Sequence, residues 1–339
     1  MPDRLSFAEV DAFARDYLTA SGADAKNAAA LAELVAKSER DGPKSHGLAM
    51  LPRYRQSFES GYANPAASPQ ITQIAPSVLR GDGDNGYYQL ASAEARAPLI
   101  ALAQETGLAG FTCANCHHLA ALRFDTEALA EAGLIAICVV NSLALIVPHG
   151  GQKPVFGTNP MSFACPRPGR APIVWDQSSS VVALMDIKLA AQRGEKLEAP
   201  GGLDASGRPT TDAAAINDTL SLLPFAAHKG TGIALMVEIL GAALAGGRLS
   251  TQTEEKDGFG ALNVKPGVTM IALDPARWGH DGFAEAVAQI VEAIEAEPGA
   301  RVPGDGRLAK RATAEAGGIP VDDALLKSLG YSAKSATTG

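Results

Sequence analysis

The chain has 339 residues, of which 46% are hydrophobic, 19% are charged and 5% are aromatic. This is the composition of an ordinary folded protein, and the chain is long enough for two or three modules with more than one core layer. The formal net charge is −8 and no basic stripe interleaved with aromatic residues runs along the sequence, which argues against nucleic-acid binding as the main activity.

The sequence has no pattern typical of export or of a membrane span. Its first residues, MPDRLSFAEVDAF, are acidic and amphipathic, unlike a signal peptide. The longest apolar stretch, near residues 133–140, has the length of a strand and not of a transmembrane helix. The cysteines are therefore expected to be reduced thiols in a cytoplasmic protein; they are Cys113, Cys116, Cys138 and Cys165.

The first seventy residues read as helical. Ser6 followed by Glu9 is a capping box, and the pattern then predicts helices over residues 7–19, 25–41 and 47–60. A short turn separates the second helix from the third. Ser45 and His46 are thus expected at a helix N-terminus, where unpaired backbone N–H groups and the helix dipole favour an anion.

Beyond residue 70 the pattern alternates between strands and helices. Strands are predicted at 77–80, 108–114, 134–140 and 173–175, and helices at 87–106, 124–132, 230–249 and 283–296. Residues 191–210 are rich in glycine and proline and indicate a surface excursion. We expect a helical module at 1–70, completed by C-terminal helices at about 283–330, an α/β region at 71–282 for cofactor and substrate, and a frayed tail at 331–339.

The segment Gly81–Gly86, GDGDNG, matches the glycine pattern of a dinucleotide-binding turn between a strand and a helix. Its intervening residues are acidic, which a diphosphate would disfavour. The following predicted strand also ends without the acidic residue that would hold a ribose. A tight glycine turn is the better interpretation of this segment.

The segment Cys113–His117, CANCH, matches the attachment pattern of c-type haem. Haem attachment requires an exported chain, which this sequence does not indicate. Zinc would require further ligands at metal spacing, and only His118 lies nearby. We therefore expect buried, unreactive thiols at a strand end, and no metal.

Serine hydrolase chemistry lacks its main sequence support, because no GxSxG segment is present. Ser45 and His46 are adjacent, which is an awkward geometry for a nucleophile and its base. On residue chemistry alone, a helix cap and a surface histidine are the simpler interpretation of this pair.

Several short segments together point to a known family, because they occur in a characteristic order. They are Ser45–Gly47, Asn115–Leu122, Pro148–Gly151, Gly157–Pro160, Asp176–Ser180, His228–Gly230 and Arg301–Gly304. Over roughly residues 5–330 the chain resembles the malate/L-lactate dehydrogenase family, which is unrelated to the Rossmann-type enzymes. The runs HHLAALRFDTEALAEAGL and LLPFAAHKG are most similar to its branch of Δ1-piperideine-2-carboxylate/Δ1-pyrroline-2-carboxylate reductases.

The resemblance implies a non-Rossmann α/β fold with a helical N-terminal module, and a homodimer. It implies NADPH-dependent reduction of cyclic ketimines to L-pipecolate or L-proline by hydride transfer, with NADH as a possible replacement for NADPH and without a metal. An NAD(P)-dependent 2-hydroxyacid dehydrogenase is the alternative within the family. The resemblance excludes neither of these two reactions.

The resemblance also assigns roles to residues. Ser45, His46 and Asp186 match a relay in which the aspartate orients a proton donor, so that the serine is not a nucleophile. Met50, Thr158, Leu184 and Met185 fall where relatives contact the substrate. The cofactor positions are His118, Leu119, Ala120, Ala121, Leu122, Ser142, Asp176, Gln177, Ser178, His228, Lys229, Arg301, Pro303, Gly304, Asp305 and Gly306.

The chain departs from the family pattern at two substrate positions. Relatives usually have an arginine for the substrate carboxylate where this chain has Met50, and a small or polar pair where it has Leu184 and Met185. Arg53 or the N–H groups of the Ser45–Gly47 turn are candidates to replace the arginine. Otherwise the carboxylate is weakly held and simple cyclic imines are accepted as well.

Overall fold

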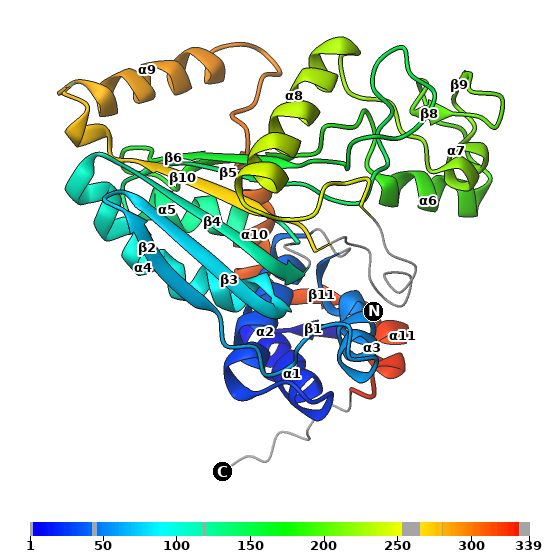
Figure 1. Cartoon of the computed structure of the whole chain (residues 1–339), viewed down its shortest axis with the longest axis horizontal. Helices are drawn as coiled ribbons and strands as arrows, with labels where there is room; N and C mark the ends of the chain where they lie inside the picture. The colour runs from blue at the N-terminus through cyan, green and yellow to red at the C-terminus, as the bar shows by residue number, and fades with distance from the viewer. Residues whose placement is uncertain (1–2, 43–45, 118–119, 253–264, 280, 332–339) are drawn as a thin grey trace.

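The computed structural model describes residues 3–42, 46–117, 120–252, 265–279 and 281–331 (Figure 1). At the N-terminus, α1 (Phe7–Ala20) begins at the predicted capping box, since the Glu9 N–H donates to Ser6 Oγ and the Ser6 N–H donates to the Glu9 carboxylate. Asp24 caps α2 (Ala25–Asp41). The predicted third helix divides into η2 (Leu48–Met50) and α3 (Leu51–Glu59), with a proline in the first turn of α3.

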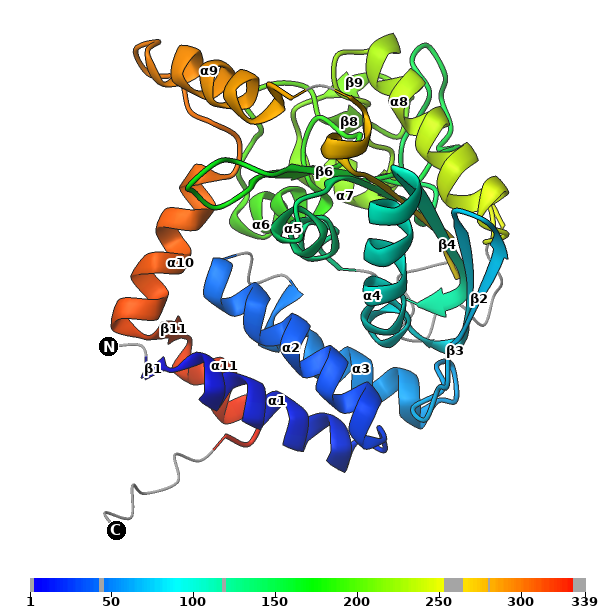
Figure 2. The same cartoon turned by 90° about the vertical axis from the view of Figure 1, so that its left-hand side faces the viewer.

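The two ends of the chain meet in the helical module. Strand β1 (Asp3–Leu5) pairs antiparallel with β11 (Ile319–Val321). Helices α10 (Asp305–Gly317) and α11 (Asp323–Ser328) flank β11 and lie beside α1 and α2 (Figures 1 and 2). In both views α9 (Phe283–Glu295) lies apart from these helices, beyond the far side of the sheet.

A mixed sheet of seven strands forms the centre of the α/β region. Its order is β2-β3-β4-β10-β5-β6-β7, and only β3 and β4 are parallel neighbours. Strand β10, from the C-terminal part of the chain, separates β4 from β5. The bounds are β2 (Gln70–Ala75), β3 (Val78–Tyr87), β4 (Leu108–His117), β5 (Ile135–Val140), β6 (Met161–Cys165), β7 (Ile173–Gln177) and β10 (Val268–Leu273).

Helices cover both faces of this sheet. Helices α4 (Tyr88–Thr106) and α5 (Arg123–Glu131) pack on one face, over a core that includes Phe111 and Leu99. On the other face lies α8 (His228–Glu238), which continues as the π-helix η3 (Ile239–Leu244) where the sequence predicted one long helix. A smaller unit beside it contains α6 (Leu184–Arg193), β8 (Gly202–Leu203), β9 (Pro209–Thr210) and α7 (Ala213–Thr219).

The GDGDNG segment is part of β3 and not the tight turn that we expected. Its pairing with β4 shifts register between Asp82 and Gly86. A Cβ at Gly83 would lie 2.6 Å from the Cβ of Cys116, and one at Gly86 would lie 2.2 Å from the Cβ of Ala67. These glycines therefore allow close packing around β3, which explains a dinucleotide-like pattern without a dinucleotide site.

The expectation of buried thiols is confirmed, since all four cysteines are free and buried. Contact with Cys113 and burial raise the pKa of Cys116 well above its ordinary value, so its thiol is unreactive at neutral pH. In the described part of the chain, no three His, Cys, Asp or Glu side chains are grouped as a metal would require. No helix among the described residues has the length and apolar character needed to cross a bilayer.

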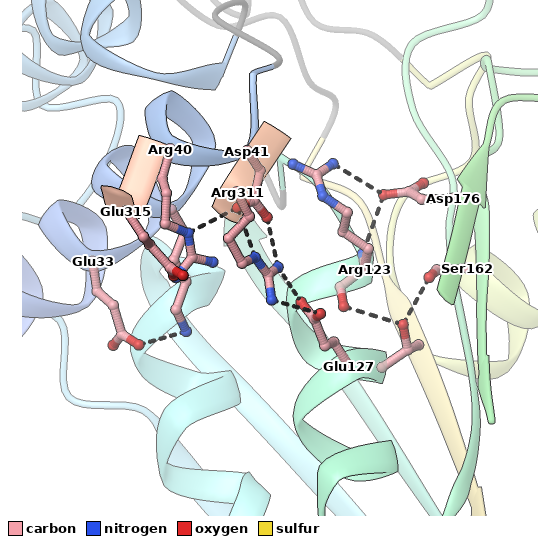
Figure 3. Close-up of polar contacts among 11 residues, drawn as sticks. Glu33, Arg40, Asp41, Arg123, Glu127, Ser162, Asp176, Arg311 and Glu315 are labelled. Atoms are coloured by element: carbon pink, nitrogen blue, oxygen red, sulfur yellow. Dashed lines mark hydrogen bonds and ion pairs between the residues drawn. The ribbon is translucent and has the colours of Figure 1, made fainter. Parts of the chain in front are cut away.

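An ionic cluster joins the helical module to the α/β region (Figure 3). Arg311 on α10 donates to both carboxylate oxygens of Asp41 on α2, at 3.0 and 2.7 Å, and to both of Glu127 on α5, at 2.9 and 2.8 Å. Asp41 and Glu127 are only 2% and 5% exposed. Burial acts to raise the pKa of Asp41, but the hydrogen bonds from Arg311 and Arg40 outweigh burial and lower it.

Replacing Arg311 by Met should destabilise the protein strongly, because two buried carboxylates would lose their shared partner. We expect the free energy of unfolding, measured by urea denaturation, to fall by about 3–5 kcal/mol. Arg55→Met is the matched control, since Arg55 pairs with Glu59 on the exposed surface of α3; it should cost less than about 1 kcal/mol. Equal losses for the two variants would contradict the assignment of Arg311 as a junction.

Candidate active site

His46 lies in the turn between α2 and η2, and a buried carboxylate holds this turn. Glu39 on α2 is 4% exposed, and its Oε1 accepts a hydrogen bond of 2.7 Å from the N–H of Leu48. A Cβ at Gly47 would lie 2.1 Å from the same oxygen, so glycine is required there. Glu39 therefore fixes the chain just after His46. Ser45, the predicted relay serine, lies outside the described residues.

The surroundings of His46 favour its neutral imidazole. Burial lowers the pKa of His46, and the positive charge of Arg123 lowers it further, from 6.5 to about 4. A neutral imidazole at pH 7 can accept a proton. It can donate a proton near neutral pH only if its pKa rises enough for the imidazole to be protonated there, and an anion that offsets the charge of Arg123 would shift the pKa in that direction.

Arg123 begins α5 and is 7% exposed. Its backbone N–H donates to Oδ2 of Asp176 at 3.1 Å, whereas its guanidinium Nη1 is 3.9 Å from the same oxygen (Figure 3). The guanidinium carbon lies 4.3 Å from the centre of the Phe124 ring. Nε and Nη2 of Arg123 are shielded from water and have no hydrogen-bond partner in the part of the chain that the structure describes. Asp176 therefore caps α5 but leaves most of the guanidinium unsatisfied.

Thr158 and Ser142, which the sequence assigns to substrate and cofactor, are in contact. Their hydroxyl oxygens are 3.1 Å apart, and Ser142 Oγ also accepts the N–H of Thr158 at 3.0 Å. The N–H of Ser179 donates to the carbonyl of Thr158 at 2.7 Å. The structure thus brings Thr158 and Ser142 together with the residues that follow β7.

A buried network of polar side chains stabilises the segments that carry Thr158 and Ser142. Nδ2 of Asn159 donates to Oε2 of Glu238 at 2.9 Å, and Ser250 Oγ donates to the same oxygen at 2.6 Å. Oδ1 of Asn159 accepts the N–H of Ser142 at 3.3 Å. A Cβ at Gly157 would lie 2.5 Å from three oxygen atoms, so glycine is required in this motif.

The start of α8 presents His228 and Lys229 to solvent. Two residues in the left-handed region, Ala226 and Ala227, lead into this helix. A Cβ at Gly230 would lie 2.0 Å from the carbonyl oxygen of Phe225, which explains the glycine after the lysine. These predicted cofactor residues therefore stand on a tightly constrained helix start.

The predicted cofactor loop at 301–306 is held against β7. Gly304 has φ of 96°, and a Cβ there would lie 2.4 Å from the carbonyl oxygen of Val174. Asp305 pairs with the buried Arg167 at 3.0 Å. Arg301, Pro303 and Gly306 are exposed. Just after the loop, Nε and Nη2 of Arg307 are shielded from water and have no partner, as in Arg123.

The remaining substrate positions differ in exposure. Met185 is exposed and Leu184 half-buried in the first turn of α6. The side chain of Met50 is 8% exposed and packs in the core of the helical module. Asp186 is exposed, and its carboxylate makes no hydrogen bond to the residues that the structure describes. The relay through Asp186 therefore stays a prediction.

The last predicted cofactor positions surround the start of α5 and the end of β7. His118 and Leu119 lie outside the described residues. Ala120 has a positive φ of 58°, and Ala121 and Leu122 are buried. At the end of β7, Gln177 is exposed and the hydroxyl oxygens of Ser178 and Ser180 are 2.7 Å apart.

An anionic cofactor fits the chemistry of this region. The buried Arg123 and the half-buried Arg307 each have an Nε–Nη2 edge that is shielded from water and unpaired among the described residues. Such an edge binds carboxylate or phosphate through two parallel hydrogen bonds. Arg307 directly follows the predicted cofactor loop. The phosphates of a nicotinamide dinucleotide would satisfy such groups.

Several of these residues escaped the sequence analysis. Arg123 directly precedes the helix predicted at 124–132 and Arg307 falls among the expected C-terminal helices, and nothing in their spacing indicates that their guanidinium groups are shielded from water. Glu238 lies in an apolar helix, where a lone carboxylate could have been noticed as a buried polar group in need of partners. Glu39 and Arg167 give no comparable signal.

Known proteins resemble the chain over nearly its whole length. The model of the malate/L-lactate dehydrogenase family matches residues 5–330. A Δ1-pyrroline-2-carboxylate/Δ1-piperideine-2-carboxylate reductase of Pseudomonas putida is 38% identical over 326 residues, which cover 96% of each chain. An NADP(+)-dependent (2R)-3-sulfolactate dehydrogenase of Chromohalobacter salexigens is 36% identical over 92% of each chain.

Solved structures agree with the sequence comparison. The crystal structure of Δ1-piperideine-2-carboxylate reductase from Pseudomonas syringae pv. tomato superimposes with a TM-score of 0.93 at 37% identity, and the match covers 96% of this chain and 98% of that one. The predicted non-Rossmann α/β fold is therefore confirmed. The extent of these matches shows that the chain belongs to the malate/L-lactate dehydrogenase family.

Proposed function

We propose that this protein is an NADPH-dependent reductase of cyclic ketimines, which converts Δ1-piperideine-2-carboxylate and Δ1-pyrroline-2-carboxylate to L-pipecolate and L-proline. The observation that supports this most strongly is the full-length similarity to reductases named for these two substrates. The neutral His46 beside the unsatisfied Arg123 agrees with it, since the site offers a titratable proton carrier next to a positive charge.

The reaction adds a hydride to the imine carbon and a proton to the imine nitrogen. The nicotinamide cofactor supplies the hydride when bound. The chain supplies the proton through His46, which must take it from solvent before it can pass it on. Thr158, whose hydroxyl contacts Ser142, would orient the substrate. Asp186 would stabilise the charged imidazole, as in the predicted Ser45–His46–Asp186 relay.

The binding of a carboxylated substrate can prepare this proton transfer. In the ligand-free chain, burial and Arg123 hold the pKa of His46 at about 4. A carboxylate beside Arg123 offsets one of these two causes and raises the pKa of His46. Burial, the larger cause, continues to lower the pKa, so substrate binding would favour protonation of His46 only in direction.

Cofactor preference, oligomeric state and location complete the proposal. NADPH is favoured over NADH by the positive charge of Arg307 beside the predicted cofactor loop, which suits a cofactor with an additional phosphate. A homodimer is supported by the exposed apolar side chains of Leu235, Ile239 and Leu244 on α8 and η3, which suit a subunit interface. A cytoplasmic location is supported by the free, buried cysteines.

Reduction of a 2-oxoacid is the second candidate, favoured by the similarity to a sulfolactate dehydrogenase. Both reactions place a carboxylate beside the atom that accepts the hydride, so the same site would serve either. A ketimine and a 2-oxoacid differ in the atom that receives the proton. Direct comparison of the two substrate classes therefore decides between them.

The purified protein should oxidise NADPH when Δ1-piperideine-2-carboxylate or Δ1-pyrroline-2-carboxylate is supplied. The measurement is the absorbance of the reduced nicotinamide, with NADH and NADPH in parallel. Pyruvate with and without methylamine is the control, because a ketimine reductase needs the amine. Faster reduction of 2-oxoacids without amine would favour the second candidate, and turnover of neither class would refute the proposal.

Replacing His46 by Ala should lower kcat by about 10²- to 10⁴-fold, the usual contribution of a positioned acid or base. Asp186→Asn should lower kcat less. Both variants should bind NADPH as the wild type does, as measured by fluorescence titration. Wild-type turnover in either variant would remove that residue from the mechanism.

His46 should also make stability depend on pH. Its pKa is 6.5 in the unfolded chain and about 4 in the folded chain, so between these values the unfolded chain binds the extra proton. The contribution of His46 to stability is therefore intact above about pH 6.5 and is lost as the pH falls towards 4. Urea denaturation should show that His46→Gln loses less stability than the wild type over this interval, and parallel losses would contradict the low pKa.

A further inference from the structure

Burying a cation whose N–H donors have no hydrogen-bond partner costs free energy in a folded chain, and Arg123 is such a cation. Arg123 is 7% exposed, and its Nε and Nη2 have no hydrogen-bond partner among the described residues. The charges of Asp41 and Glu127 also act on it, but the carboxylate paired with it is that of Asp176, which is 3.9 Å from Nη1 and already accepts the N–H that begins α5. An unpaired buried charge of this kind predicts an anion that is absent from the isolated chain.

The position that relatives use for the substrate carboxylate cannot perform this role here. Met50 carries no donor, and its side chain is packed among apolar residues of the helical module. Arg55, on α3, is exposed and paired with Glu59. Arg53, the candidate named from the sequence, is half-buried on α3, so water already solvates part of its charge. A buried cation on another element gains more from the substrate carboxylate than Arg53 does.

Two unsatisfied arginines are available, and their surroundings distinguish them. Arg123 is the charged group that acts on His46, the proposed proton carrier. Arg307 lies on α10, directly after the loop at 301–306. Its charge acts on Arg123, so the two guanidinium groups are neighbours, but only Arg123 acts on His46. An anion on Arg123 would thus lie near the reacting atoms, and an anion on Arg307 near the cofactor loop.

We propose that Arg123 binds the carboxylate of the substrate through its Nε–Nη2 edge and replaces the arginine that this chain lacks at position 50. The inference rests on the proposed function and names the residue that sets its substrate class. A guanidinium edge and a carboxylate are both planar and form two parallel hydrogen bonds, so the ring of the substrate is also oriented. Arg123 selects imines that carry a carboxylate on the reacting carbon.

If Arg123 binds the substrate carboxylate, the enzyme should prefer 2-carboxy imines to cyclic imines that lack the carboxylate. Without Arg123, a 2-carboxy imine loses a charge-assisted pair, whereas an imine lacking the carboxylate loses no such pair. The accompanying rise in the pKa of His46 affects both imines alike. The substrate preference of the wild type should therefore be strong, contrary to the weak binding and broad scope expected from Met50 alone.

The test compares Arg123→Met with the wild type on Δ1-piperideine-2-carboxylate and on Δ1-piperideine, which has the same ring without the carboxylate. We expect kcat/KM for the carboxylated imine to fall by about 30- to 1000-fold, the loss typical of one partner of a buried charge pair. The value for Δ1-piperideine should change less than about threefold. Arg123→Lys, which keeps the charge and loses the planar edge, should be intermediate.

Binding measurements show whether the anion that binds Arg123 is the substrate carboxylate or a phosphate of the cofactor. Fluorescence titration should give Arg123→Met a dissociation constant for NADPH close to that of the wild type. Pyrrole-2-carboxylate, a planar ligand that cannot be reduced at an imine, should bind the NADPH complex of the variant at least tenfold more weakly. Arg55→Met should match the wild type in every measurement, and thermal unfolding should show that all variants are folded.

The opposite results overturn the inference. If NADPH binding weakens at least tenfold in Arg123→Met, the anion is a phosphate of the cofactor. Equal losses on the two imines, or no loss on either, exclude a carboxylate contact. If the wild type reduces no imine, the proposed function fails, and the titration with pyrrole-2-carboxylate still decides the carboxylate role: weaker binding in the variant supports it, and equal binding excludes it.

Discussion

The active-site region depends on how buried charge is matched at the meeting point of three helices. Arg311 neutralises Asp41 and Glu127 together, and so fixes the end of α2 against α5 and α10. His46 follows the end of α2, Arg123 begins α5 and Arg307 lies in the first turn of α10. Arg311, whose guanidinium is paired with two carboxylates, therefore helps to position Arg123 and Arg307, whose Nε–Nη2 edges are unpaired among the described residues. Satisfied charge provides rigidity here, and unsatisfied charge provides affinity for an anion.

The local elements of the fold could be predicted from the sequence, because their causes are local. Ser6, Glu9 and Asp24 cap their helices through contacts within one turn, and the helix and strand patterns around residues 88–140 depend on spacing alone. The position of β10 could not be predicted. Its apolar run would suit any buried strand, and its place between β4 and β5 follows from contacts with chain far away in the sequence.

Residues of the candidate site could be predicted from the sequence only where they belong to one of the family-like segments. Gly157 and Gly304 mark close approaches that exclude a side chain, and these appear as glycines within the family-like segments. Arg123 has no comparable sequence signal, because an arginine at a helix start usually faces solvent. The burial of Arg123 depends on how α2, α5 and β7 meet. The same limit applies to Met50, whose position on a short helix could be predicted but whose packing into the core could not.

The pairing of β1 with β11 has a consequence for how the protein is made. The strand that begins the chain finds its partner near the end, and α2 receives Arg311 only when α10 has been synthesised. The sheet, likewise, cannot close until β10 has separated β4 from β5. A ribosome must therefore synthesise the chain as far as β11 before the module around His46 can be completed, and folding is governed by contacts of long sequence separation. A chain truncated before β11 would expose the apolar faces of α1 and α2.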